Sequence, residues 1–391
     1  MNIHLYRLLA SVKHGVIDIY SYLLTLFFSA LPLKNNRVII ISFAGKGYGD
    51  NGRYIAEELL KHKEIEIYWV ANRQFSSKVP TGIKLVRYNS FSYLRILATS
   101  KIWINNTRFM YKVHKRKQQK YIQIWHGNLA LKRIEFDGNM PKRYIKTMKR
   151  DNNLIDLMIS NSNFCTNMFK KSFKYDGAIE KYGTARDDIF FHKIKRNEAI
   201  SRVKDKYNIE EKTKVLTYAP TFRNSYENDP YNINIEDLKE TLETITKQKW
   251  VILLRLHPLV NNNEILKNKT AINASNYPDM QELICASDIV ITDYSSVMFE
   301  SMIADKSVIL YASDIDSYRK ERGYYFKFEE LPFPIATNNQ ELAKIINKFN
   351  KKDQRKQYAS FKKKIGLIED GKASERITRY ILETMENGYA K

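Results

Sequence analysis

Short apolar runs alternate with amphipathic segments along most of this chain. RVIIISFA, at residues 37–44, is continuously apolar, which is typical of a strand buried on both faces of a sheet. Residues 53–62 have apolar side chains at helical spacing. Further apolar runs predict strands at 65–72, 101–107, 120–126 and 154–162. Alternating strands and helices predict a parallel α/β sheet.

A second series of the same kind follows a charged stretch at residues 190–209. Its predicted strands end in polar residues and lie at 214–222, 250–258, 288–296 and 307–312. A chain of 391 residues is also too long for one ordinary core. We therefore predict two α/β domains, at 36–190 and 191–370, with an N-terminal helical segment at 1–35 and a C-terminal helix at 371–391.

The apolar run GVIDIYSYLLTLFFSALPL, at residues 15–33, has basic residues on both sides. Asp18 interrupts it, and the uninterrupted part is shorter than the roughly 20 apolar residues that a membrane-spanning helix needs. No clear signal-peptide cleavage site follows. The pattern favours an amphipathic helix on a membrane surface. The alternative is a helix that packs on the protein's own body.

The formal net charge of +22 favours a polyanionic partner, which can be nucleic acid, an anionic membrane or a phosphorylated substrate. No nucleic-acid-binding module is recognisable, so we do not expect nucleic acid. The basic cluster KVHKRKQQK, at 112–120, is either a solvated face or a docking strip for a bilayer or a phosphate polymer. Cys165 and Cys285 have neither metal-ligand nor disulfide-framework spacing, which fits a reducing cytoplasm.

The loop at residues 44–53 carries Gly47-x-Gly49-x-x-Gly52 between a predicted strand and a predicted helix. This spacing is the formal fingerprint of a dinucleotide site. The next strand ends in Asn72-Arg73 instead of an acid, so the dinucleotide would be NADP and the protein an NADP-dependent oxidoreductase. The alternative is a flexible turn whose backbone amides border a cleft.

Two histidines lie at carboxyl ends of predicted strands, where open α/β sheets bind their ligands. His126 precedes Gly127, which allows a sharp turn, and Lys132 is expected on a following helix. His257 lies two residues after Arg255. Each histidine alone could be structural, but one comes from each predicted domain, and both suit proton or phosphate handling.

The apolar part of the predicted strand at 288–296 ends at Asp293, and Ser295 and Ser296 follow it at a predicted helix start. This arrangement indicates either a phosphate site or a simple helix cap. The chain has no motif for a bound metal or for a covalent nucleophile. The expected chemistry is therefore acid–base catalysis with electrostatic stabilisation of phosphates.

Five stretches carry a resemblance to a known family: IQIWHGNLALKRIEFD, YGTARDDIFF, RLHP, residues 288–335 and DGKASERI. Together they resemble the CDP-glycerol glycerophosphotransferases, the teichoic acid and capsule polyol-phosphate transferases of bacteria. The resemblance implies a GT-B-type α/β fold, with two Rossmann-like domains facing each other across a cleft. It implies a peripheral enzyme on the cytoplasmic face of the membrane. Its donor would be CDP-glycerol or CDP-ribitol, and its acceptor an undecaprenyl-type lipid-linked glycan or polyol-phosphate chain, without a separate cofactor or metal.

The resemblance also implies roles for individual residues, with His126 and His257 as the two key histidines. The resemblance assigns the donor phosphates to Gly183, Arg186, Asp187, Asp293, Ser295 and Ser296. The positions of Arg223 and Arg255 at predicted strand ends add them to this donor side. The same strand-end rule places Gly47, Gly49, Asp50, Asn51 and Gly127 in an acceptor-side cleft, to which Lys132 adds positive charge. The sequence departs from the family pattern at WHGNLALK and at ARDD, which leaves the acceptor and the choice of glycerol or ribitol open. Which histidine is the base, whether one or many units are added, and the oligomeric state are also open.

Overall fold

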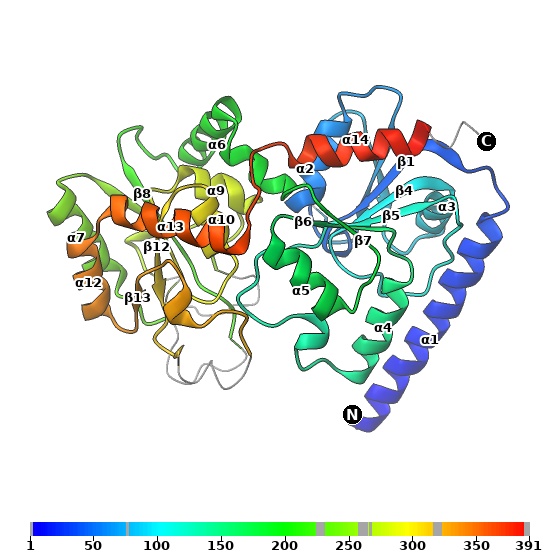
Figure 1. Cartoon of the computed structure of the whole chain (residues 1–391), viewed down its shortest axis with the longest axis horizontal. Helices are drawn as coiled ribbons and strands as arrows, with labels where there is room; N and C mark the ends of the chain where they lie inside the picture. The colour runs from blue at the N-terminus through cyan, green and yellow to red at the C-terminus, as the bar shows by residue number, and fades with distance from the viewer. Residues whose placement is uncertain are drawn as a thin grey trace. The chain divides into compact units, whose positions relative to one another are not determined.

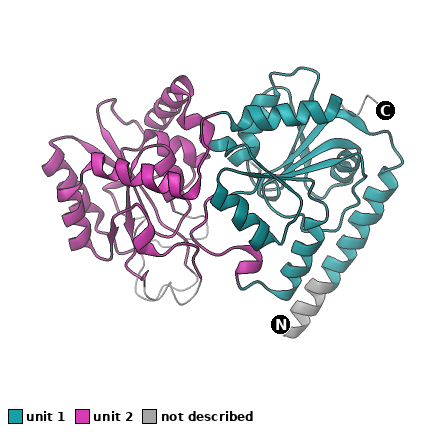
Figure 2. Cartoon of the chain, viewed as in Figure 1, with its two compact units in different colours: residues 1–128, 139–186, 372–391 teal, residues 129–138, 187–371 magenta. Residues whose placement is uncertain are grey.

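The computed structural model describes residues 3–75, 78–223, 231–256, 265, 268–315 and 323–386, with side chains from Val12 onward. These residues form two compact units (Figure 2). Unit 1 consists of Met1–Asn128, Asn139–Arg186 and Lys372–Lys391, and unit 2 consists of Leu129–Gly138 and Asp187–Gly371. The units are therefore not the continuous segments that the strand pattern suggests, because Leu129–Gly138 belongs to unit 2 and the C-terminal helix to unit 1.

Unit 1 is built on a parallel sheet (Figure 1) whose described strands have the order β3-β2-β1-β4-β5-β6-β7. The strands are β1 (Lys34–Ile41), β2 (Glu66–Ala71), β3 (Ile83–Arg87), β4 (Ser100–Asn105), β5 (Lys120–Gln123), β6 (Leu157–Ser160) and β7 (Ala178–Lys181). The helices are α1 (Ile3–Phe28), α2 (Asp50–Leu59), α3 (Phe91–Thr99), α4 (Lys142–Asn152), α5 (Asn163–Phe173) and α14 (Ala373–Glu386).

Unit 2 has a second parallel sheet, with the described strands in the order β10-β9-β8-β11-β12-β13. The strands are β8 (Lys214–Ala219), β9 (Trp250–Leu254), β10 (Ala271–Asn273), β11 (Ile289–Thr292), β12 (Ser307–Tyr311) and β13 (Ile335–Ala336). The helices are α6 (Lys193–Lys206), α7 (Ile235–Thr246), α9 (Met280–Ala286), α10 (Val297–Ile303), α12 (Asn339–Lys348) and α13 (Lys351–Ile365). Short 3-10 turns lie at Phe43–Gly45, Glu135–Asp137, Ala185–Phe190 and Phe328–Glu330.

The continuous apolar runs form strands that are buried on both faces, as the sequence predicts. Val38, Ile39 and Ile40 in β1 are fully buried, and so is Trp103 in β4. In both sheets the strand order reverses between two neighbouring strands, β1 and β4 in unit 1 and β8 and β11 in unit 2. The crevice outside such a switch point is where open α/β sheets bind ligands. The residues that follow these strands are therefore the first candidates for a site.

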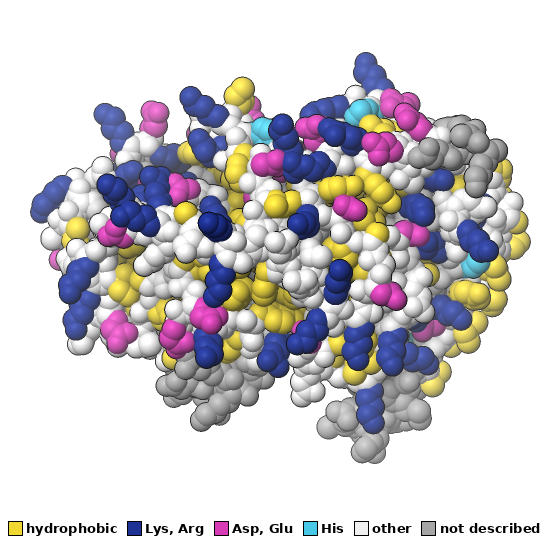
Figure 3. All heavy atoms as spheres, in the orientation of Figure 1, with side chains coloured by type: hydrophobic (Ala, Val, Ile, Leu, Met, Phe, Trp, Pro, Cys, Tyr) yellow, Lys and Arg dark blue, Asp and Glu magenta, His cyan; other side chains and the backbone are white. Residues whose placement is uncertain are grey.

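Helix α1 packs against the rest of unit 1 on one side and is exposed on the other, and its contact with a membrane stays a prediction. Its inner side packs on unit 1, where Asp18 accepts hydrogen bonds from Lys112 N and Arg150, and Thr25 Oγ1 accepts one from His114 N. Its outer side exposes an apolar stripe at helical spacing, made of Val12, Val16, Ile19, Leu23 and Phe27. Apolar side chains line the right-hand edge of the molecule in Figure 3, where α1 lies in Figure 1. Within the described residues, no helix combines the length and hydropathy required to cross a membrane.

Candidate functional site

The His126 side chain is held by the backbone of a neighbouring strand end. Its Nδ1 atom lies 2.8 Å from the carbonyl oxygen of Asn106, directly after β4. A carbonyl oxygen can only accept a hydrogen bond, so in the neutral imidazole the proton is on Nδ1 and the lone pair is on Nε2. This tautomer suits a general base that acts through Nε2.

The backbone of the His126 turn is fixed by residues of α2 and of the 3-10 turn at Ala185–Phe190. Asn51 Nδ2 donates to the Trp125 carbonyl over 2.9 Å, and Arg186 Nη1 donates to the His126 carbonyl over 3.0 Å. Arg186 N in turn donates to Asn51 Oδ1 over 3.1 Å. Trp125 has a φ of 39°, a strained conformation for a residue with a large side chain, and its buried ring packs edge-on against Phe173. Surrounding contacts thus hold this turn in a conformation that it would not adopt alone.

A buried ion pair lies beside this turn. The guanidinium of Arg186 contacts the carboxylate of Asp50, and their side chains are only 8% and 5% exposed. Asn106 Nδ2 also donates to Asp50, which closes a polar network from Asp50 through Arg186 and Asn106 to His126. The guanidinium of Arg186, predicted to bind donor phosphate, is engaged in supporting the His126 turn in this structure.

The glycine loop does not have the geometry of a dinucleotide site. The residue that requires glycine is Gly45, with a φ of 82°, where a Cβ atom would lie 2.8 Å from Asn72 N. Gly47 accepts a hydrogen bond from Trp69 on its carbonyl, and Gly49 is extended. Asp50 occupies the first turn of α2, where its negative charge opposes a pyrophosphate. The geometry therefore argues against the NADP alternative, and the loop serves to place Asp50 and Asn51 beside His126.

The prediction of a helix after Gly127 is wrong. Residues Leu129–Gly138 have an irregular backbone apart from the 3-10 turn at Glu135–Asp137, and they belong to unit 2, where Lys132 forms an isolated antiparallel bridge with Tyr324. The apolar and basic spacing in LALKRIEF resembles a helix, but the long-range pairing with Tyr324 overrides it. Lys132 accordingly belongs to unit 2, although the sequence assigned it to the acceptor-side domain.

In unit 2, Asp293 follows β11 and forms the centre of a second buried cluster. Its carboxylate accepts from Thr221 N over 2.9 Å and from Arg223 Nη2 over 2.7 Å. Arg223 also pairs with Asp314, with 2.7 Å between Nε and Oδ2. Burial lowers the pKa of Arg223, but Asp293 and Asp314 outweigh it and raise that pKa above its ordinary value. Arg223 and Asp293, both predicted to bind phosphate, thus pair with each other and shape the β8 and β11 ends.

Unit 2 contains three further described residues that were predicted to act on the donor side, namely Ser295, Ser296 and Arg255. Ser295 and Ser296 are half-buried and precede α10, and Ser296 makes no side-chain cap. Because α10 has only seven residues, its dipole is small. The two serine hydroxyls would therefore contribute more to phosphate binding than the dipole does. Arg255 donates to the carbonyls of Ala274 and Ser275, and burial lowers its pKa. His257 lies outside the described residues.

The YGTARDD motif forms the loop after β7. Gly183 has a φ of 97° and its N–H donates to the Ser160 carbonyl over 3.0 Å, so the left-handed conformation explains the glycine. The side chain of Thr184 accepts from Asn128 Nδ2 over 2.8 Å, which ties this loop to the residue that ends unit 1's part of the His126 turn. Asp187 is buried where the chain enters unit 2.

Sequence reasoning missed two polar residues of these clusters, namely Asn106 and Asp314. Asn106 stands in WINNT, at the end of a predicted strand, so the strand-end rule could have selected it. Asp314 gives no such signal, because its pairing with Arg223 joins residues 91 positions apart. Among the described residues, no group of three metal-ligating side chains is assembled.

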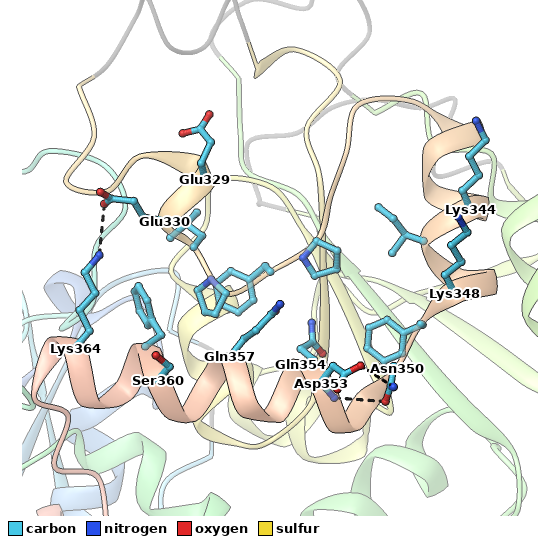
Figure 4. Close-up of a pocket in the computed structure, with 17 residues that line it drawn as sticks. Glu329, Glu330, Lys344, Lys348, Asn350, Asp353, Gln354, Gln357, Ser360 and Lys364 are labelled. Carbon is cyan, nitrogen blue, oxygen red and sulfur yellow. Dashed lines mark hydrogen bonds and ion pairs between the residues drawn. The ribbon is translucent and has the colours of Figure 1, made fainter.

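A cavity of about 710 Å³ lies elsewhere in unit 2 (Figure 4). It is lined by α12, α13 and the 329–334 loop, and Lys364 faces Glu330 at 3.8 Å across it. Its lining contains none of the described residues of the two strand-end clusters. Volume alone therefore does not mark the site in this protein.

Comparisons with known proteins agree with the fold and the motifs. The family model for CDP-glycerol:poly(glycerophosphate) glycerophosphotransferase matches residues 23–383. The chain is 31% identical over 373 residues to the teichoic acid poly(glycerol phosphate) polymerase of Bacillus subtilis (strain 168), covering 91% of this chain but 50% of that protein. It is 30% identical to the teichoic acid glycerol-phosphate transferase of Staphylococcus aureus (strain NCTC 8325 / PS 47), covering 95% of this chain and 98% of that protein. The chain thus spans about half the length of the first relative and nearly all of the second.

A solved structure of the wall teichoic acid polymerase TagF, a histidine-to-asparagine variant, superposes with a TM-score of 0.85 at 28% identity, covering 100% of both chains. TagF was also solved after a soak with CDPG, and with a different histidine replaced by alanine. A teichoic acid ribitol-phosphate primase of Bacillus spizizenii (strain ATCC 23059 / NRRL B-14472 / W23) is 27% identical, covering 92% of this chain and 94% of that protein.

The two parallel α/β units, each with a polar cluster at its switch point, define a GT-B-like protein. The chain belongs to the CDP-glycerol:poly(glycerophosphate) glycerophosphotransferase family. The resemblance carried by the sequence motifs is therefore confirmed.

Proposed function

We propose that this protein transfers glycerol phosphate from CDP-glycerol to a hydroxyl group of an acceptor and releases CMP. The observation that carries the proposal is the fixed tautomer of His126, within a chain that belongs to this family. In the reaction, the acceptor oxygen forms a bond to the β-phosphorus while the bond from that phosphorus to the CMP oxygen breaks. The acceptor's proton moves to Nε2 of His126.

His126 is the proposed general base because an alcohol is a weak nucleophile at neutral pH, and a positioned base contributes about 10²–10⁴-fold. The network of Asp50, Arg186 and Asn106 would keep the imidazole in its reactive tautomer. An imidazolium formed after proton transfer would lie near the Asp50–Arg186 pair, which is neutral as a whole. The Asp50–Arg186 pair therefore does not repel the imidazolium as an unpaired arginine would.

Unit 2 is the proposed donor-binding unit. Ser295 and Ser296 would donate hydroxyl hydrogen bonds to the diphosphate, on a loop that the Asp293–Arg223–Asp314 cluster holds rigid. We propose that His257 stabilises the phosphate charge and that Arg223 and Arg255 act mainly by supporting these loops.

The proposed acceptor is a lipid-linked glycan or polyol-phosphate chain, and the proposed location is the cytoplasmic face of the membrane. The exposed stripe on α1 supports this location, because isolated exposed apolar residues are common but a continuous helical stripe is not. Lys142, Arg143, Lys146 and Lys149 on α4 are exposed or half-buried cations, and α4 is tied to α1 through Arg150 and Asp18. This combination suits an anionic bilayer.

The experiment that tests the proposed function is CMP release by the full chain with lipid-linked acceptors. CDP-glycerol and CDP-ribitol are compared at equal concentrations, and NADPH binding is measured in parallel. We expect CMP release with CDP-glycerol and no tight binding of NADPH. Faster release with CDP-ribitol would favour the ribitol alternative, and no release with either donor would contradict the proposal.

A further inference from the structure

The chain makes a left-handed turn shortly after β1. Phe43, Ala44 and Gly45 have φ values of 44°, 53° and 82°, so three successive residues have a left-handed backbone. Glycine adopts this conformation readily, but in other residues the Cβ atom comes too close to the following carbonyl oxygen. Gly45 therefore suits the turn, whereas Phe43 and Ala44 are held in it at a cost in conformational energy.

Neighbouring strand ends hold this turn in place. Phe43 N donates to Asn106 Oδ1 over 2.9 Å, directly after β4. Asn72 N, directly after β2, donates to the Gly45 carbonyl over 2.8 Å, and Gly45 N donates to the Ser42 carbonyl over 2.8 Å. Because β2, β1 and β4 are adjacent in the sheet of unit 1, the sheet itself anchors the strained residues.

The side chain of Phe43 lies beside the His126 imidazole. Their ring centroids are 5.6 Å apart, with an angle of 58° between the ring planes. Asn106 contacts both residues, because its carbonyl oxygen lies 2.8 Å from His126 Nδ1 while its side chain accepts from Phe43 N. All three residues belong to unit 1. The residue that fixes the imidazole tautomer therefore also places the Phe43 ring next to the proposed base.

The imidazole has aromatic neighbours that differ in exposure. The centroid of the Trp125 ring lies 4.2 Å from that of His126, and Trp125 is only 5% exposed. Phe43, in contrast, is 41% exposed. Trp125 belongs to the core, whereas much of Phe43 is open to solvent. Glycine or asparagine would adopt the left-handed backbone at lower cost, so core packing and backbone geometry do not account for a phenylalanine at this position.

We propose that Phe43 is a specificity residue that favours an alcohol over water as the nucleophile. Its ring forms an apolar wall beside His126, and the carbon atoms next to the acceptor's hydroxyl group pack against it. Water has no carbon atoms and gains nothing from this contact. This inference rests on the proposed function for its substrates and on the geometry of unit 1 for the position of the ring.

The reaction that Phe43 suppresses is hydrolysis of the donor. A water oxygen forms a bond to the β-phosphorus of CDP-glycerol, and the bond from that phosphorus to the CMP oxygen breaks. One proton of the water moves to Nε2 of His126, and the products are CMP and free glycerol phosphate. Transfer and hydrolysis thus share the donor and the base and differ only in the nucleophile, so a contact with the carbon atoms of the nucleophile changes their ratio.

The test measures both reactions in the wild type and in Phe43→Ala, with CDP-glycerol and a lipid-linked polyol-phosphate acceptor. Free glycerol phosphate reports hydrolysis, and the lengthened acceptor reports transfer. We expect the ratio of hydrolysis to transfer to rise about 10-fold in Phe43→Ala, which is the effect of roughly two buried CH₂ groups. Phe43→Tyr keeps the ring and should keep the ratio within about twofold of the wild type. Leu85→Ala shortens another exposed apolar side chain of unit 1, in β3, and is the control that should leave the ratio unchanged.

A second measurement is independent of turnover. In ordinary helix and strand positions alanine is more stable than glycine, because glycine loses more conformational freedom on folding. At a left-handed position the order reverses, so Phe43→Gly should melt at a higher temperature than Phe43→Ala. The opposite order would overturn the strained turn and the inference built on it. An unchanged ratio of hydrolysis to transfer in Phe43→Ala would overturn the role of Phe43 alone, whereas a wild type that releases no CMP would contradict the proposed function itself.

Discussion

The Nδ1 atom of His126 lies 2.8 Å from the carbonyl oxygen of Asn106. The two residues come from the ends of neighbouring strands, β5 and β4, so the sheet itself sets their separation. Because the partner is a backbone carbonyl, no side-chain substitution directly removes it, and the tautomer is fixed by the fold. The polar network around Asp50 and Arg186 then fixes the turn that carries the imidazole.

The buried Arg223 pair should matter far more for stability than an exposed pair. Replacing Arg223 with Met leaves the carboxylates of Asp293 and Asp314 buried without their cation, and should lower the free energy of unfolding by about 3–5 kcal/mol. Arg355 and Asp305 form an ion pair that is about half exposed, so Arg355→Met is the matched control and should have little effect. Chemical denaturation measures both, and equal losses would contradict the assignment of Arg223 as a structural cation.

The docking of α1 should weaken in acid. Burial and then Arg116 lower the pKa of His114, and burial and then Arg143 lower the pKa of His14. Because the unfolded state binds a proton more readily than the folded one, this stability contribution is present above the ordinary pKa of about 6.5 and is lost as the pH falls through the lowered values. Between about pH 7.5 and about pH 5.5, the melting temperature of the wild type should fall further than that of a His14→Asn/His114→Asn variant. Equal falls would show that these histidines do not contribute.

The apolar stripe on α1 should bind lipid vesicles. Replacing Ile19 and Leu23 with Glu places two charges at positions that are 63% and 55% exposed, so folding should be little affected. Binding to phosphatidylglycerol vesicles in a flotation assay should weaken about 10-fold or more. Ile194 on α6 is 75% exposed but lies outside the stripe, so Ile194→Glu is the control and should bind as the wild type does. Unchanged binding of the double variant would remove α1 from the membrane contact.

The sequence predicted the two sheets because their central strands are continuous apolar runs, such as Val38–Ile41, that only a doubly covered sheet can bury. It also selected His126, Asp50, Asn51 and Asp293, because parallel topology places strand ends at one edge. These predictions depend only on local pattern and on topology, which are both visible in one sequence.

Other features depend on pairings between distant residues, and the sequence did not reveal them. Asp50 pairs with Arg186 across 136 positions, which turns a predicted phosphate ligand into part of the His126 support. Residues Leu129–Gly138 have helical spacing, but Lys132 pairs with Tyr324, so the local pattern indicated the wrong structure and the wrong unit. His257 lies outside the described residues, and its role stays a prediction.

The most direct measurement of the central claim is the rate of CMP release from CDP-glycerol by His126→Ala. If Nε2 of His126 is the general base, kcat should fall by about 10²–10⁴-fold, while CDP-glycerol affinity and the melting temperature stay close to those of the wild type. Release of CMP at near the wild-type rate by a folded His126→Ala variant would contradict the account.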